Sequence, residues 1–180
     1  MASWSRVARR IRVPLGFAFA ALYIVLAKPK WWSIVAGSAV AALGIALRAS
    51  ASGHVKKNEE LTMTGPYAHT RNPLYVGSIL IGVGFGIASL NIWVAVALVA
   101  LFIAIYVPVV RSEEAFLRSK FPQFDDYARR VPRFGYRFST ANAARGFSRE
   151  LYLKHREYNA LIGALLMLAA LAAKLMWWPR

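Results

Sequence analysis

The chain has 180 residues, 58% of them hydrophobic, and a mean hydropathy of +0.41; because soluble domains are about 45–50% apolar, we expect an integral membrane protein. It has no cysteine, which excludes disulfides and thiolate metal sites, and its three histidines lie far apart in sequence, so no metal is expected. Positive-inside bias and contact with anionic lipid explain the formal charge of +15, so we expect the membrane bilayer as a partner and no nucleic acid.

Apolar runs separated by polar breaks predict an all-α membrane protein with one domain over residues 1–180. A very short turn separates the third run from the fourth, so these two helices must be antiparallel. Pro108 lies near the end of the fourth run and is expected to kink it. We expect about five transmembrane helices, at residues 13–27, 31–49, 74–90, 92–110 and 160–176.

Small residues recur at helix-packing spacing in two of these runs. The second run carries Gly37, Ala41 and Gly44, and the third carries the pair Gly82 and Gly86. Membrane helices approach closely where side chains are small. We therefore expect close helix packing at both sets of positions.

The only long polar segment covers residues 111–158 and is expected to be cytosolic, helical in part and irregular in part. The fourth helix should continue to about Phe121, because Pro122 follows. Residues 139–146 are small and polar and predict a linker. Ser148 can cap a short amphipathic helix that follows.

The distribution of Lys and Arg predicts the orientation of the five helices. With the N-terminus inside, the inner segments carry 4, 4 and 11 of the 23 basic residues, against 4 outside. All eight acidic residues also lie inside. This bias predicts a cytoplasmic N-terminus, a cytoplasmic active site and residence in the inner (plasma) membrane of the cell. The inner segments are residues 1–12, 48–72 and 111–158.

Between the second and third runs lies the polar stretch 62–77. Gly65 and Pro66 are turn residues, because glycine permits positive φ and proline fixes φ. Asn72 precedes Pro73, which suits the first position of a helix. Two tyrosines, a histidine, an arginine and an asparagine fall within nine residues here, which suits a ligand with charged and flat parts. The alternative interpretation is a capped connection with interfacial aromatics.

Two consecutive carboxylates, Glu113 and Glu114, follow the fourth run. Glu114 and Arg118 have the i,i+4 spacing of a helical ion pair, which gives Glu114 a structural explanation. Glu113 has no local partner at that spacing. A carboxylate at the edge of the bilayer is best retained where it binds a cation or hydrogen-bond donors. The pair therefore predicts a binding site.

Two motifs in this order resemble the signature of the isoprenylcysteine carboxyl methyltransferase and phospholipid methyltransferase superfamily. The first is GPYAHTRNPLYVG at 65–77, and the second is RSEEAFL at 111–117 with Phe121, Tyr127 and VPRF at 131–134. The resemblance covers residues 60–136. It implies a small multispanning enzyme that uses S-adenosylmethionine at the cytosolic membrane face, with a cofactor pocket covered by the two motifs. Its acceptor would be a lipid or a lipidated molecule.

The resemblance also implies roles for individual residues. A glutamate would hold the ammonium or ribose hydroxyls of the cofactor, and tyrosines would lie against its adenosine. An arginine would orient an anionic acceptor or the cofactor's carboxylate. The catalytic residues would be Arg111, Glu114 and Arg133. The cofactor-binding residues would be Gly65, Pro66, Tyr67, Arg71, Asn72, Pro73, Tyr75, Glu113, Glu114 and Tyr127.

The sequence departs from the family pattern at three places. Many members have histidine where this chain has Asn72, and an amide does not titrate, so no proton transfer is expected there. Pro122 replaces the usual glycine after Phe121, and the usual second proline after Arg133 is missing. These changes concern the lid over the substrate more than the cofactor site.

Two functions from different classes remain open. The first is methyl transfer to a membrane-embedded acceptor, which would enter sideways through a gap between Leu74 and Val76 on one side and Val109 and Val110 on the other. The second is a non-catalytic membrane protein that binds lipid or assists assembly and retains the fold. A transporter is disfavoured, because no charged side chain is expected to be buried within the spans.

Overall fold

The computed structural model describes residues 16–57, 59–137 and 146–177, and its regular structure there is entirely helical. The basic segment 1–12 lies outside the described residues, as does all of the expected linker 139–146 except Gly146. Each of the five apolar runs forms a helix. The elements are a first helix at Gly16–Leu26, α2 at Trp31–Ser52, the 3-10 turn η1 at Gly65–Ala68, α3 at Pro73–Ser89, α4 at Ile92–Leu101, the π-helical η2 at Phe102–Tyr106, α5 at Val107–Lys120, α6 at Phe124–Arg130, α7 at Arg149–Lys154 and α8 at Tyr158–Trp177.

Three of these helices are long and apolar enough to cross a membrane: Trp31–Ser52, the continuous Ile92–Lys120 and Tyr158–Trp177. The other two apolar helices are shorter in the part of the chain that the structure describes. Large apolar side chains point outward, such as Leu166 at 67% exposure and Trp93 at 74%. Such surfaces suit hydrocarbon as the surrounding solvent, so the chain has the character of an integral membrane protein. The number of crossings stays a prediction.

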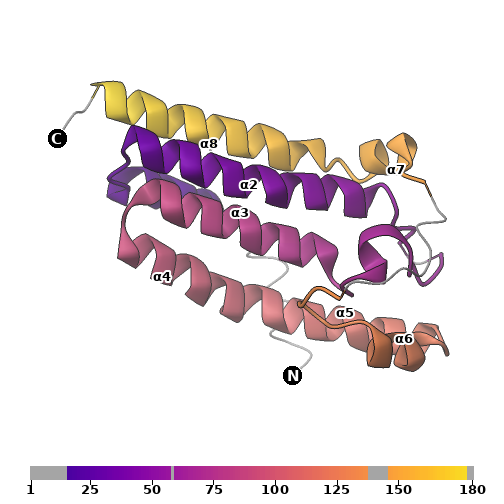
Figure 1. The fold of residues 1–180 in the computed structure, drawn as a ribbon. Coiled ribbons are helices and arrows are strands. Elements are labelled where there is room, and N and C mark those ends of the chain that lie inside the picture. Colours follow the sequence, from indigo (N-terminus) through magenta and orange to yellow (C-terminus); the bar gives the residue numbers. More distant parts are fainter. Residues whose placement is uncertain (1–15, 58, 138–145, 178–180) are drawn as a thin grey trace.

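The long helices lie side by side, with α2 between α3 and α8, and α4 beside α3 (Figure 1). The chain reverses between α3 and α4 at Leu90, whose φ of 46° is left-handed, as is common at the end of a helix. The antiparallel pair predicted for these two runs is therefore confirmed. One end of the bundle gathers η1, α5, α6 and α7, so both sequence motifs lie at that end (Figure 1).

Glycines allow α2 and α3 to pack backbone against backbone. A Cβ added at Gly37 would lie 2.8 Å from the Cβ of Ala88, and one at Gly77 would lie 2.7 Å from the carbonyl oxygen of Gly44. Gly84 faces α2 in the same way. The prediction of close packing by the small residues of the second run is confirmed.

The prediction for Gly82 and Gly86 was wrong. A Cβ added at Gly82 would meet nothing within 4 Å, and one at Gly86 would make only ordinary contact with Ala95 at 3.7 Å. The face of α3 that meets α2 carries Gly77 and Gly84 instead, seven residues apart, which is two turns of helix. Gly82 lies on a different face, which borders a cavity described below.

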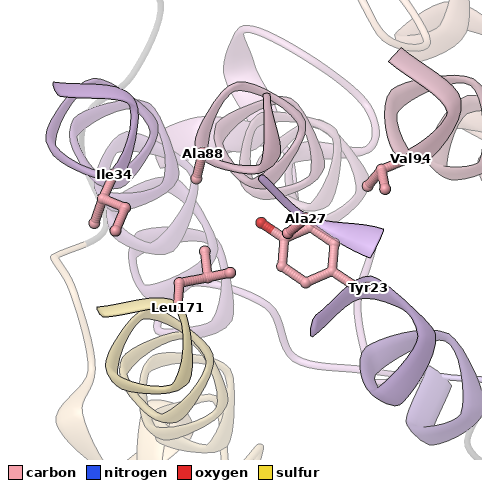
Figure 2. Close-up of a cluster of buried hydrophobic side chains, with 6 residues drawn as sticks. All are labelled: Tyr23, Ala27, Ile34, Ala88, Val94 and Leu171. Carbon is pink, nitrogen blue, oxygen red and sulfur yellow. The ribbon is translucent and has the colours of Figure 1, made fainter. Parts of the chain in front are cut away.

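Buried apolar side chains from five segments form a core at the end of the bundle opposite the motifs. They are Tyr23, Ala27, Ile34, Ala88, Val94 and Leu171 (Figure 2). The hydroxyl of Tyr23 donates to the carbonyl oxygen of Phe85 at 2.8 Å. Nearby, Nζ of Lys174 in α8 donates to the carbonyl oxygens of Ile24, Val25 and Ala27 at 2.6–2.8 Å. This lysine satisfies carbonyls that the end of the first helix leaves open.

The irregularity expected from Pro108 takes the form of a π-helical segment. A proline cannot donate to the carbonyl four residues earlier, and its ring crowds that carbonyl. The π-helical residues Phe102–Tyr106 come directly before the turn that contains Pro108. Such single-turn insertions are frequent at functional sites.

A charged side chain does lie within a long apolar helix, contrary to our expectation. The guanidinium of Arg48 in α2 donates to both carboxylate oxygens of Glu157 at 2.7–3.1 Å. It also donates to Oγ of Ser78 at 2.6 Å and to the carbonyl oxygen of Leu74 at 3.1 Å. Arg48 therefore joins α2, α3 and the start of α8, and its charge is paired rather than free.

Candidate functional site

A cavity of about 600 Å³ lies where the two motifs meet. Pockets for small molecules usually measure about 300–1,000 Å³, so this one has the size for a cofactor. Its walls come from the loop before η1, from the start of α3, from α5 and from α6. The residues predicted from the sequence that line it are Tyr67, Arg71, Asn72, Tyr75, Glu113, Glu114 and Tyr127.

Glu114 connects the two motifs. Its side chain is buried, and its carboxylate accepts hydrogen bonds from Nδ2 of Asn72 at 3.0 Å and from Nε and Nη2 of Arg133 at 2.9 and 2.7 Å. Nε of Arg71 lies 3.6 Å from the same carboxylate. The hydrogen bond to Glu114 raises the pKa of Arg133. A buried carboxylate is retained when it has such partners.

The expected helical ion pair between Glu114 and Arg118 was wrong. Arg118 lies outside this network and pairs with Asp125 at 2.7 Å, where both side chains are largely exposed. The turn at Pro122 brings α6 back beside the end of α5, which puts Asp125 within reach of Arg118. The carboxylate of Glu114 is directed inward, where it meets Asn72 and Arg133.

The segment after α6 runs beside the segment after η1. The backbone N–H of Arg71 donates to the carbonyl oxygen of Pro132 at 2.9 Å, and the N–H of Arg137 donates to that of His69 at 3.0 Å. The rings of His69 and Tyr136 stack with their centroids 4.7 Å apart. Residues of the second motif are therefore fixed against the first by backbone bonds, a ring contact and the carboxylate of Glu114.

The tyrosines supply flat surfaces and neutral hydroxyls. The hydroxyl of Tyr127 donates to the carbonyl oxygen of Tyr67 at 2.7 Å, which fixes α6 against η1. Burial raises the pKa of both phenols, so both stay protonated at neutral pH. The ring of Tyr75 meets that of Tyr106 edge to face at 5.6 Å. Tyr75 therefore lies between the cavity and the π-helical segment.

Two charged groups at the cavity are available to a ligand. Glu113 is exposed, lines the cavity and makes no ion pair with the residues that the structure describes. Nε of Arg71 is buried without a hydrogen-bond partner, which is uncommon in native proteins. The cavity thus presents a carboxylate and a guanidinium together with aromatic rings. These groups suit a ligand that carries an ammonium, a carboxylate and a flat ring.

Other predicted residues support the site without lining the cavity. Gly65 has a φ of 57° and lies under the ring of His54, so this position requires glycine. Pro66 is the second residue of η1, and Pro73 is the first residue of α3. Arg133 acts through Glu114, whereas the structure does not bring the exposed Arg111 to the cavity.

The cavity is also lined by polar residues that the sequence analysis did not select. They belong to the loop that follows α2, where charged residues immediately precede the first motif. That closeness in sequence was the available signal. These residues are Lys56, Lys57, Glu60 and Thr62.

The lateral gap expected between Leu74 and Val76 on one side and Val109 and Val110 on the other stays a prediction. Val109 and Val110 are buried, and Tyr75 packs against the cluster of Val109 and Ile105.

A second, larger cavity of about 1200 Å³ lies along the helices, with apolar walls from the first helix, α3, α4 and α8. Arg48 connects the two cavities: it bonds Ser78, which lines the apolar cavity, and the backbone of Leu74, which lines the polar one. Tyr106 lines the apolar cavity and contacts Tyr75 of the polar one. The two cavities are therefore neighbours.

Part of this chain is similar to two characterised proteins. The cobalt-zinc-cadmium resistance protein CzcN of Cupriavidus metallidurans is 42% identical to this chain over 84 residues. The nickel-cobalt-cadmium resistance protein NccN of Alcaligenes xylosoxydans xylosoxydans is 45% identical over the same length. Each match covers 47% of this chain and 39% of the relative, so the chain matches about two fifths of the length of either. No solved structure matches the chain.

The sequence profile of one family matches residues 18–123. This range contains most of the first helix, all of α2 and α3, the whole first motif and both glutamates of the second. The matched range is more than half of the chain, and the family is described as phospholipid methyltransferase. Given the helical architecture, the apolar surfaces and this match, the chain belongs to the phospholipid methyltransferase family.

Proposed function

We propose that this protein transfers a methyl group from S-adenosylmethionine to a lipid-like acceptor at the cytosolic face of the inner membrane. Membership of a methyltransferase family supports the reaction class. The observation that carries the proposal is the polar cavity at which Glu114 ties the two motifs together. The whole chain would act as one domain, with five crossings and this end of the bundle in the cytoplasm.

The residues at the polar cavity fit the cofactor. Glu113 would hold its ammonium group, and the terminal nitrogens of the Arg71 guanidinium, whose Nε faces Glu114, would donate to its carboxylate. Tyr67 and Tyr75 would lie against the adenosine. When bound, S-adenosylmethionine supplies a methyl group that is already activated by the sulfonium charge. The remaining task of the protein is to exclude water and to align the acceptor, and alignment alone is worth about 7–11 kcal/mol.

The acceptor would be held across the boundary of the two cavities. Its reactive head would lie near Tyr75 and Tyr106, while its apolar part would occupy the 1200 Å³ cavity between the membrane helices. Asn72 cannot act as a base, so an acceptor that needs no deprotonation, such as a carboxylate, suits the site better than a strongly basic amine. Burying each methylene of a tail contributes about 0.8 kcal/mol, which favours long-chain acceptors.

Equilibrium titration of the purified protein in detergent with S-adenosylmethionine tests the cofactor assignment. Glu113→Gln keeps the shape of the side chain and removes its charge, so it should weaken binding while leaving stability unchanged. Glu150→Gln, at an exposed position of α7 away from the cavity, is the matched control. Equal affinity for all three proteins would remove Glu113 from the site, and no binding at all would contradict the proposal. Tight binding without methyl transfer to membrane lipids would favour the non-catalytic alternative.

A further inference from the structure

Two glycines inside α3 and α8 border the apolar cavity without serving helix packing. A Cβ added at Gly82 in α3 or at Gly163 in α8 would meet no atom within 4 Å, whereas Gly77 and Gly84 are in tight contact with α2. Gly82 and Gly163 both line the apolar cavity. Glycine within a helix costs about 1 kcal/mol relative to alanine. A packing contact offsets that cost at Gly77 and Gly84, but not at the two cavity glycines.

The two cavity glycines lie at the same depth. Both α3 and α8 begin at the end of the bundle that carries the motifs (Figure 1). Ser78 bonds Arg48, as does Glu157, which lies two residues before Asn159. Gly82 follows Ser78 by four residues, and Gly163 follows Asn159 by four residues, so each lies about 6 Å deeper along its helix. The cavity continues along α3 as far as Leu90, about 18 Å from Ser78 at 1.5 Å per residue.

The shape and surroundings of the cavity indicate its occupant. It runs parallel to the membrane helices, its walls are mostly apolar, and three polar residues, Arg48, Ser78 and Asn159, line the end next to the polar cavity. The amide of Asn91 lies at the other end, where its Nδ2 donates to the carbonyl oxygen of Leu26. A hydrocarbon chain with its head at the end next to the polar cavity matches this distribution. At its far end the cavity is lined by Tyr23, which belongs to the core of Figure 2, and by Leu90 and Ile92 beside the turn between α3 and α4.

We propose that Gly82 and Gly163 determine specificity: they keep the cavity open at one depth, so that the hydrocarbon chain of the acceptor lipid can pass them towards Tyr23 and Ile92. This inference rests on the proposed function only in taking the bound lipid to be the methyl acceptor. Larger side chains at these positions would narrow the passage from α3 and from α8. Long chains would then be excluded beyond that depth, whereas short chains would still fit.

Photolabelling tests this inference without requiring activity. The full chain is reconstituted in vesicles of phosphatidylcholine and phosphatidylglycerol that contain phosphatidylserine, whose head group carries a carboxylate, with a diazirine in one acyl chain. One probe carries the diazirine at the chain end and another carries it next to the ester. In the wild type, the end-labelled probe should react near Tyr23 and Ile92, and the ester-labelled probe near Tyr106. In the double variant Gly82→Leu/Gly163→Leu, only the deep labelling should fall, by about fourfold for each methylene excluded.

Two controls separate the possible results. Ala42→Leu adds the same bulk on an exposed face of α2 away from the cavity and should leave both labels unchanged. Binding of S-adenosylmethionine should be equal in all variants, because the substitutions lie outside the polar cavity. Deep labelling that persists in the double variant would overturn the inference, as would a changed oligomeric state, which would assign the glycines to a contact between chains.

Product analysis distinguishes this inference from the proposed function. Methylated lipids formed by the double variant should carry shorter chains than those of the wild type. If the labels shift but no variant methylates any lipid, the chain site stands and the proposed function fails. If methylation proceeds with unchanged chain lengths and unchanged labels, the proposed function stands and the chain site fails.

Discussion

The carboxylate of Glu114 offers the sharpest test of how the site is held together. Glu114→Gln keeps the size of the side chain but removes its charge. One amide oxygen cannot replace both carboxylate oxygens, so the bonds from Asn72 and Arg133 cannot all be retained, and the amide N–H groups would face a guanidinium. We expect this variant to be strongly destabilised and to bind S-adenosylmethionine poorly.

The size of the expected loss of stability follows from the burial of Arg71 and Arg133. Leaving one partner of a buried ion pair without its counter-charge costs about 3–5 kcal/mol. The side chain of Arg133 is 43% exposed and can be rehydrated, so its share of that loss is small. The side chain of Arg71 is only 12% exposed and cannot be rehydrated in this way. We therefore expect a loss of about 3 kcal/mol, at the low end of that range.

Asp125→Asn is the matched control. Asp125 also accepts from an arginine at 2.7 Å, but both side chains of that pair are 57% exposed. Exposed pairs contribute about 0–1 kcal/mol. Reversible unfolding in mixed detergent micelles measures the free energy of unfolding of both variants. If Glu114→Gln loses no more than Asp125→Asn, burial does not set the strength of this network and the reasoning is refuted.

Three further predictions follow from other parts of the molecule. Gly84→Ala should lose about 1–3 kcal/mol in the same unfolding assay because its Cβ would lie 2.7 Å from a backbone nitrogen of α2, whereas Gly82→Ala should be neutral or gain up to about 1 kcal/mol; equal effects would contradict the packing described. The raised pKa of Tyr67 means that the folded chain holds the phenolic proton more tightly than the unfolded chain does. The contribution of this phenol to stability is therefore complete below about pH 10 and is lost as the pH rises further. Tyr67→Phe should flatten this decline when the free energy of unfolding is measured across alkaline pH. In a chain without native cysteines, Lys57→Cys should react only from the cytoplasmic side and Arg180→Cys only from outside; labelling of both from one side would reject the fifth crossing.

Local signals predicted the boundaries of the helices well. Pro73 starts α3, and α5 ends at Lys120, two residues before Pro122. Ser148 caps α7 by accepting from the N–H of Leu151 at 3.3 Å. These features depend on neighbours in the chain, and the chemistry of a proline or a cap acts over a few residues.

Contacts between distant residues could not be predicted in the same way. The i,i+4 rule gave Glu114 a partner within its own helix, but its actual partners include Arg133, which comes from an irregular segment that folds back. Arg48 and Glu157 are 109 residues apart, and nothing in either neighbourhood points to the other. The cavity residues Glu113 and Arg71 were selected through the family resemblance, while their complementary charges at one cavity became visible only in three dimensions.

The glycines show a further limit of pattern reading. A spacing of four marked Gly82 and Gly86, but the helix contact uses Gly77 and Gly84. Spacing identifies residues that share a face of a helix, yet it does not say which face meets another helix and which borders open space. The partner helix decides that, and here its own glycines are Gly37 and Gly44.

The bonds from Lys174 have a consequence for how the chain is assembled during synthesis. Its ammonium group holds the carbonyls of Ile24, Val25 and Ala27, so the last helix completes the first. The ribosome makes residues 16–27 long before it makes Lys174. Until then these three carbonyls must find water or lipid head groups, and the first helix cannot settle in its final position. A nascent chain that stops short of Lys174 would therefore insert with its first helix still unanchored, which makes the synthesis of α8 the point at which the bundle closes.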